Sequence, residues 1–185
     1  MVKEILKDAE QKMLKAVDVT RTELIKIRTG KATTALLDAV RVDYYGSHVP
    51  LNQVANISIP DVHTIAIQPW EKSMIATIEK AIIAANLGFN PANDGTIVRV
   101  PIPMLNEERR KELVKLSKKF GEEGKISVRN VRRDAIEHLK KSEKAEHFSE
   151  DERKRGEHQL QEMTDTHIAE IDQLLVRKEK EILEV

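Results

Sequence analysis

The feature that most constrains the fold is a proline-free, strongly charged stretch from residue 106 to about residue 148. Strong helix formers dominate it, so the stretch predicts one long helix. On a helical wheel of about 100° per residue, one side gathers the apolar residues Leu113, Leu116, Phe120, Val128, Val131 and Ala135. An arc of about 100° opposite gathers a set of cations that we call the basic strip: Lys111, Lys115, Lys118, Lys125, Arg129, Arg132, Arg133 and Lys140. One side is therefore predicted to pack and the other to carry positive charge.

Two further helices are predicted to pack beside this one. In residues 2–29 the apolar spacing alternates between three and four: Leu6, Ala9, Met13, Ala16 or Val17, Thr20, Leu24 and Ile27. We expect Gly30 to end this helix, with Arg28 in its last turn. In residues 149–183, Ser149 and Glu152 have the spacing of a capping box, and the apolar stripe is Leu160, Met163, His167, Ile171, Leu174 and Ile182. The short preceding loop predicts an antiparallel return and hence a three-helix bundle.

The middle of the chain, residues 32–103, has a different texture. It contains all six prolines and short β-branched runs at residues 39–45, 54–59, 64–68 and 96–100. We expect turns at Gly46-Ser47, at Pro60-Asp61 and at residues 93–95. Residues 72–85 have apolar residues at helical spacing, namely Ile75, Ile78, Ile82 and Ile83. The segment predicts a compact α+β module of about 70 residues, a size that is marginal but can fold alone.

Two connections join this module to the helices, and together they form a natural hinge. The predicted hinge residues are Thr29, Gly30, Lys31, Ala32, Pro103, Met104 and Leu105. The predicted domains are therefore residues 1–30 with 105–185 for the bundle, and residues 31–104 for the inserted module.

Composition excludes several classes of protein. Aromatic residues are only 3% of the chain, too few for a platform that stacks single-stranded bases. There is no cysteine, which excludes disulfides and thiolate metal sites. No apolar run approaches the roughly 20 residues of a membrane helix, and the N-terminus begins an amphipathic pattern, not a signal peptide. We expect a soluble cytoplasmic protein.

The formal net charge of zero hides a segregation of charge along the chain. Residues 106–148 hold thirteen Lys and Arg against nine Asp and Glu, whereas residues 149–185 hold six Lys and Arg against eleven Asp and Glu. The predicted second helix is thus basic and the third acidic, so the chain presents different faces to different neighbours.

No sequence motif points to catalysis. The chain has no GxGxxG, P-loop, G-x-S-x-G or HExxH motif, and its six histidines include no pair at i, i+4. His167 lies on an apolar stripe, where a satisfied core or boundary histidine is favoured over a ligand. The acidic pairs Glu107-Glu108 and Glu122-Glu123 are more simply solvated faces or helix caps than acid–base groups. We therefore predict no enzyme activity, no cofactor and no metal site.

The basic strip has two interpretations. It is either an ordinary solvated helix face or a surface for phosphate. Arg129, Arg132 and Arg133 favour phosphate, because the planar fork of arginine suits it and because a rod with few aromatics fits recognition of a nucleic-acid backbone. Gly121 and Gly124 are unusual inside a helix. Gly124 lies near the apolar side, where close helix approach explains it better than a local bend.

Six short motifs occur in order along the chain: Lys26-Ile27-Arg28-Thr29-Gly30, Val42-Asp43-Tyr44-Tyr45-Gly46, Leu87-Gly88-Phe89-Asn90-Pro91, Val100-Pro101-Ile102-Pro103, Glu107-Glu108-Arg109-Arg110-Lys111 and Val128-Arg129-Asn130-Val131-Arg132-Arg133-Asp134. Over essentially the whole chain, they resemble the motifs of the bacterial ribosome recycling factor family. Each motif alone is weak, but together and in this order they are specific.

The resemblance implies an L-shaped α+β protein, in which a long antiparallel three-helix bundle carries an inserted small β/α/β domain on a flexible hinge. It implies a factor that acts with elongation factor G and GTP to split the post-termination 70S ribosome into subunits. The bundle would lie against ribosomal RNA of the large subunit, and the smaller domain would move. Carried over to this sequence, the RNA-contacting residues are Arg110, Arg129, Arg132 and Arg133, with Arg28 in the first helix.

We therefore expect a monomeric, non-catalytic translation factor that binds neither DNA nor membranes. Two alternatives remain open. A coiled-coil scaffold or chaperone would bind proteins through the bundle, insensitively to salt. An enzyme with its site in residues 32–103 would need a pocket with convergent polar groups, and the sequence shows no such set.

Overall fold

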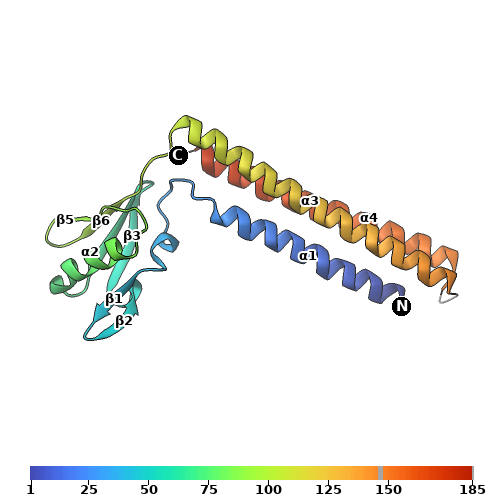
Figure 1. Cartoon of the computed structure of the whole chain (residues 1–185), viewed down its shortest axis with the longest axis horizontal. Coiled ribbons are helices and arrows are strands. Elements are labelled where there is room, and N and C mark those ends of the chain that lie inside the picture. The colour runs from blue at the N-terminus through green and yellow to red at the C-terminus, as the bar shows by residue number, and fades with distance from the viewer. Residues whose placement is uncertain (146–147, 185) are drawn as a thin grey trace. The chain divides into compact units, whose positions relative to one another are not determined.

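The computed structural model describes residues 1–145 and 148–184, and the chain divides into two compact units (Figure 1). One unit joins Met1–Arg28 to Glu107–Glu184, and the other is Thr29–Asn106. The first unit contains the three long helices α1 (Val2–Lys26), α3 (Glu107–Lys144) and α4 (Glu150–Leu183). Within the described residues, no helix combines the length and apolar character needed to cross a membrane.

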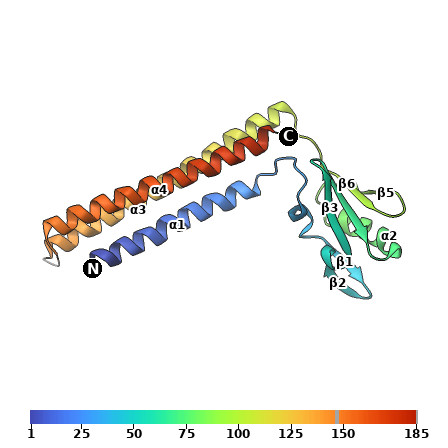
Figure 2. The same cartoon turned by 180° about the vertical axis from the view of Figure 1, so that it is seen from behind.

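The three helices run side by side as a bundle, as both views show (Figures 1 and 2). Lys118 of α3 pairs with Glu179 of α4, whereas Arg132, further along α3, contacts Gln161, which comes earlier in α4. Rising numbers on one helix thus meet falling numbers on the other, and the predicted antiparallel return of α4 is confirmed. The predicted α+β class, with a long helical part and a small β-sheet domain, is confirmed as well.

The bundle core consists of two apolar clusters along its length. Their fully packed members are Ile5, Ala9, Met13, Val17, Val128, Ala135, Leu139, Leu160 and Ile171. On α1 the predicted stripe is buried except at Leu6, which is only half-buried, while Ile5 beside it is buried. On α4, Met163 and Leu174 are half-buried, and Gly156 and Thr164 occupy core positions instead.

The predicted packing side of α3 was also partly wrong. Leu116 is 37% exposed and Phe120 is half-buried, whereas Ser117, Gly121 and Gly124 are buried. The buried face is thus rotated toward small residues. Large apolar side chains would keep the neighbouring helices apart, so the closest approach uses residues with little or no side chain.

Gly124 confirms the expectation of close helix approach, and Gly121 makes a second close approach that was not predicted. A Cβ atom added to Gly121 would lie 2.7 Å from Cδ2 of Leu175 on α4. One added to Gly124 would collide with the hydroxyl of Thr20 on α1 and lie 3.3 Å from Cδ1 of Ile171. The two glycines therefore bring α3 against both of its neighbours.

Helix ends follow local chemistry only in part. The predicted capping box is confirmed, because the Ser149 hydroxyl accepts from the Glu152 backbone N–H and the Glu152 carboxylate accepts from the Ser149 N–H at 2.9 Å. The Ser149 backbone N–H, and its hydroxyl at 3.1 Å, donate to the Glu152 carboxylate and hold the pKa of Glu152 below its ordinary value. The predicted end of the first helix was wrong: α1 stops at Lys26, so Arg28 lies beyond its last turn. The long helix stops at Lys144, and part of its expected extension to residue 148 lies outside the described residues.

The second unit, described by itself, contains two antiparallel sheets and one helix. A hairpin joins β1 (Arg41–Tyr44) to β2 (Ser47–Pro50). The larger sheet has the order β3-β4-β6-β5, with bounds Ala55–Asp61, Thr64–Pro69, Val98–Pro101 and Ala92–Asn93. The helix α2 (Ile75–Ala84) follows a short 3₁₀ turn at Lys72–Met74 and packs on β1 and β6.

One apolar cluster holds this unit together, with fully buried members Val40, Val42, Ile65, Ile67, Ile78, Ile82, Val98 and Val100. The four predicted strands and the helix are present, but β2 and β5 were missed, since one ends in proline and the other has two residues. Pro60-Asp61 lies inside β3, so the turn predicted there was wrong. Ile83, predicted on the apolar face of the helix, is exposed.

Candidate nucleic-acid interface

The structure divides the basic strip into two rows. The inner row turns toward α4: Lys118 Nζ lies 3.6 Å from Glu179 Oε1, Lys125 pairs with Asp172, and Arg132 contacts Gln161. These three residues recur every seven positions, which is two turns of helix. The outer row contains the other cations of the strip, Lys111, Lys115, Arg129, Arg133 and Lys140, which are exposed and make no ion pair with α4 among the described residues.

Arg132 differs from its inner-row neighbours because its partner is neutral. Its guanidinium Nη1 donates to the side-chain oxygen of Gln161, while Lys118 and Lys125 face carboxylates. The Gln161 amide is itself oriented, since its Nε2 donates to Asp165 Oδ1 at 2.8 Å. Asp165 thereby turns the amide oxygen toward Arg132 and fixes the guanidinium without cancelling its charge.

The arginines of the outer row are exposed. Arg129 Nη1 lies 3.0 Å from Glu122 Oε1, an exposed pair of the kind that contributes little and exchanges readily. Arg133 has no hydrogen-bond or ion-pair partner among the described residues. Three different guanidinium groups thus lie within about one turn of helix. That of Arg132 is oriented, that of Arg129 is weakly paired, and that of Arg133 has no partner among the described residues.

The other two predicted contact residues lie apart from this group. Arg110 lies in the first turn of α3 and is half-buried, and its Nε atom is buried without a hydrogen-bond partner among the described residues. Arg28 is exposed and lies beyond the end of α1. The structure therefore gathers three of the five predicted arginines in one place on α3.

Some of the predicted hinge residues are hydrogen-bonded to the module. Ala32 is buried and its N–H donates to Val62 O at 2.8 Å, while His63 Nδ1 lies 3.2 Å from Gly30 O. Just before the second connection, Ile102 N–H donates to His63 O at 2.7 Å. The turn between β3 and β4 is therefore bonded to Gly30 and Ala32 of the first connection and to the residue that precedes the second.

Gly30 also brings the two connections together. Its φ is +78°, a left-handed value that favours glycine, and an added Cβ would lie 3.3 Å from Leu105 Cγ and 3.4 Å from Pro103 O. Thr29, the first residue of the second unit, is buried.

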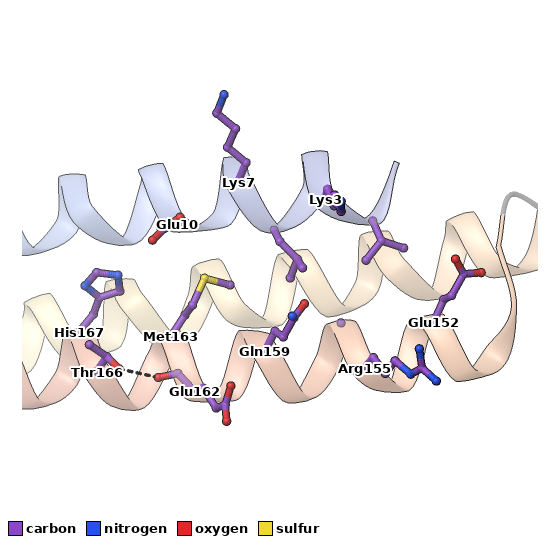
Figure 3. Close-up of a pocket in the computed structure, with 13 residues that line it drawn as sticks. Lys3, Lys7, Glu10, Glu152, Arg155, Gln159, Glu162, Met163, Thr166 and His167 are labelled. Carbon is purple, nitrogen blue, oxygen red and sulfur yellow. Dashed lines mark hydrogen bonds between the residues drawn. The ribbon is translucent and has the colours of Figure 1, made fainter.

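A groove of about 750 Å³ lies between α1 and α4, and Figure 3 shows its lining side chains. Its rim mixes cations such as Lys3 and Arg155 with carboxylates such as Glu10 and Glu162. His167 at one end is only 7% exposed, so it is a core histidine as expected. Its Nδ1 lies 3.6 Å from Glu170 Oε2, too far for a hydrogen bond, and is therefore not satisfied within the described structure. In residues 1–145 and 148–184, no cluster of three His, Cys, Asp or Glu is placed to hold a metal ion.

Comparison with known proteins decides the family. Residues 20–183 match the family described as Ribosome recycling factor. The chain belongs to the ribosome recycling factor family. The ribosome-recycling factor of Symbiobacterium thermophilum is 55% identical over 185 residues, covering 100% of both chains, and that of Ralstonia pickettii is 55% identical over 184 residues, covering 100% of this chain and 99% of the relative.

Solved structures of ribosome recycling factors agree with this assignment. A solution structure is 46% identical and covers 100% of this chain and 98% of its own, with a TM-score of 0.75. A second structure presents the T. thermophilus ribosome recycling factor and E. coli elongation factor G bound to the E. coli post-termination complex. It is 45% identical with a TM-score of 0.63 and covers 99% of each chain. The resemblance found in the sequence is thereby confirmed.

For a ribosome recycling factor, the arginines of α3 were visible in the sequence, but their supports on α4 were not. Gln161 and Asp165 are four residues apart on an acidic helix, and their spacing resembles an ordinary surface pair. Only the antiparallel packing of α4 on α3 places the Gln161 amide at Arg132.

Proposed function

We propose that this chain is the factor that recycles ribosomes: with elongation factor G and GTP, it splits the post-termination 70S ribosome into its subunits. Membership of the ribosome recycling factor family supports this proposal, as does the similar structure described on a post-termination complex with elongation factor G. The protein works as a monomer in the cytoplasm. The chain performs no catalysis and holds no cofactor, since GTP belongs to the partner.

The bundle docks on ribosomal RNA of the large subunit through α3. The observation that carries this part is the guanidinium of Arg132, which Gln161 holds in place without neutralising it. Arg133 and Arg129 lie beside it, exposed and able to turn toward phosphates. Arg110 and Arg28 contribute nearer the module, and the other cations of the basic strip supply general electrostatic attraction.

The module of residues 31–104 moves relative to the bundle and transmits the action of the GTPase. We place the pivot at those residues of each connection that are nearest to the bundle helices in sequence, around Thr29 and around Met104 and Leu105. Gly30, Ala32 and Ile102 are bonded to the β3–β4 turn or lie against it, and so travel with the module.

The test is a splitting assay, in which light scattering follows the dissociation of post-termination ribosomes with elongation factor G and GTP. We expect Arg132→Ala to split ribosomes about tenfold less efficiently, because a charge-assisted phosphate contact is lost. The matched control is Lys141→Ala, which removes one cation from another side of the same helix, where Lys141 Nζ pairs with Glu137 at 2.7 Å.

Both variants should retain the helicity and melting temperature of the wild type, and Lys141→Ala should also retain its splitting rate. A wild-type protein that leaves ribosomes intact would contradict the proposed function. Undiminished splitting by Arg132→Ala would contradict the assignment of the docking site.

A further inference from the structure

The tip of the β1–β2 hairpin carries a side chain that folding alone does not explain. Tyr45 and Gly46 are the two residues of the turn, and both have positive φ, +49° and +82°. Such type I′ turns favour Asn-Gly or Gly-Gly, because a residue with a bulky side chain is strained at positive φ. Tyr45 is nevertheless 83% exposed, so burial does not offset the strain.

Tyr45 is held in a definite place. Its ring makes an edge-to-face contact with Tyr44, with ring centroids 4.7 Å apart and an interplanar angle of 76°. Tyr44 is half-buried and packs against the apolar core of the module, so it serves as an anchor. The exposed ring therefore stands on a fixed base.

Both tyrosines converge on one carboxylate. Tyr44 OH donates to Glu71 Oε1 at 3.0 Å, and Tyr45 OH donates to Glu71 Oε2 at 3.3 Å. The hydrogen bond to Glu71 raises the pKa of Tyr44, as expected for a donor to an ionised carboxylate. No Lys or Arg among the described residues pairs with Glu71, so its charge is uncompensated.

The geometry points to a receptor for an arginine side chain of a protein partner, made by Tyr45 and Glu71. This inference rests on the proposed function, since the partner is a protein that the module meets while the ribosome is being split. A strained, exposed residue that is held by neighbours is typical of a functional site.

The unused lone pairs of the Glu71 carboxylate suit a guanidinium group. Each oxygen of Glu71 has two lone pairs, and a tyrosine hydroxyl occupies one on each. The remaining two match the parallel N–H groups of arginine, while the exposed ring of Tyr45 offers a surface for the cation to stack on. Phosphate would be repelled by the carboxylate, so the same chemistry disfavours a nucleic-acid strand.

Two variants of the full chain test the receptor. Glu71→Gln removes the charge and keeps an oxygen that accepts from tyrosine. Tyr45→Asn removes the ring and installs Asn-Gly, the preferred pair for this turn, so its melting temperature should equal or exceed that of the wild type. In the splitting assay we expect both variants to need about tenfold more factor for half-maximal rate, because a charge-assisted contact is lost. Co-sedimentation with 70S ribosomes should be unchanged.

A direct measurement uses N-acetyl-arginine amide as the probe and N-acetyl-citrulline amide, its neutral analogue, as the control. The amide NMR signals of Tyr45 and Gly46 should shift with the arginine probe and not with citrulline, and the shift should disappear in Glu71→Gln. The single tryptophan, Trp70, is 63% exposed beside Glu71 and gives a fluorescence readout of the same titration.

Equal shifts with both probes, or full splitting activity in both variants, would overturn the receptor. A loss in Tyr45→Asn with normal activity in Glu71→Gln would also overturn it, because the ring would then bind an apolar group or a base. If the wild type itself fails to split ribosomes, the proposed function fails, and the arginine titration still decides whether the receptor exists.

Discussion

At the scale of single residues, the partner of a cation decides what its charge can do. Lys125 faces Asp172 and Lys118 faces Glu179, so a carboxylate of α4 partly compensates the charge of each lysine. Arg132 instead faces the amide of Gln161, which orients its guanidinium and leaves the charge available for an external anion. Cations at equivalent positions of one helix can therefore differ in function.

This contrast predicts the effect of changing Gln161. Gln161→Glu should weaken binding to 70S ribosomes roughly three- to tenfold, because a carboxylate would compensate the charge of Arg132. Gln161→Ala should weaken binding less, since the charge is retained and only its orientation is lost. Equilibrium binding of the labelled variants to ribosomes measures both effects.

The control for this prediction is the Arg132→Ala background. There, the Gln161 variants should have no further effect on binding, because the amide acts only through the arginine. An equal loss in both backgrounds would show that Gln161 acts through something other than Arg132.

The sequence predicted which arginines gather on α3 but not how they differ. The helical wheel depends only on residue spacing, so it placed Arg129, Arg132 and Arg133 together. Whether a cation meets a carboxylate, an amide or solvent depends on the register of α4, which local spacing does not determine. For the same reason, the wheel did not separate the inner row from the outer row.

At the scale of elements, α3 approaches its neighbours through glycines and not through large apolar residues. Gly124 meets Thr20 of α1, and Gly121 meets Leu175 of α4. Thr20 keeps its own hydroxyl satisfied within α1, by donating to Ala16 O at 2.9 Å. A polar side chain can therefore sit at a close helix contact.

This packing predicts that Gly124→Ala destabilises the bundle. Alanine should add about 1 kcal/mol of helix propensity, but overpacking against Thr20 typically costs about 1–3 kcal/mol, so we expect a net loss in free energy of unfolding. Denaturant titration followed by circular dichroism measures it. Ser127→Ala, at an exposed position of α3, is the matched control and should change stability by less than about 0.5 kcal/mol.

Thr20→Ala should recover part of the lost stability in the Gly124→Ala background, because it removes the hydroxyl that an added Cβ would meet. A Gly124→Ala protein as stable as the wild type would contradict the close approach.

Elements with strong local signals were predictable, and those set by packing were not. The Ser149–Glu152 capping box is local chemistry, and it appears as predicted. The packing side of α3 was partly wrong because Leu116 and Phe120 carry the stronger apolar signal, although small residues fill the interface. Strand β2 was missed because Pro50 normally argues against a strand, and here it lies at the strand end.

At the scale of the whole molecule, a net charge of zero is compatible with a strongly directional field. The acidic helix α4 pairs with the two lysines of the inner row through Glu179 and Asp172, while Arg132 of that row faces the neutral amide of Gln161. In the outer row, Lys111 and Arg129 pair with Glu107 and Glu122 of the same helix, whereas Arg133 has no ion-pair partner among the described residues. The balance of charges thus confines the attraction for phosphate to one side of α3.

The family, the α+β class and the existence of a module were predictable from the sequence because many weak motifs occur in one order. The exact limits of the units were not, since α1 stops at Lys26 and the observed boundaries fall after Arg28 and Asn106. Those limits depend on bonds such as Ala32 N–H to Val62 O, which join residues distant in sequence.

The central claim is that the bundle binds ribosomal RNA through the arginines of α3. Its most direct test is co-sedimentation with 70S ribosomes across a salt series, comparing the wild type, Arg129→Ala with Arg132→Ala, and the control Lys141→Ala. We predict that wild-type and control binding weaken steeply with salt, and that the double variant binds less tightly with a slope smaller by about two, one for each lost phosphate contact. Wild-type binding that does not respond to salt, or a double variant with the wild-type affinity and slope, would contradict the claim.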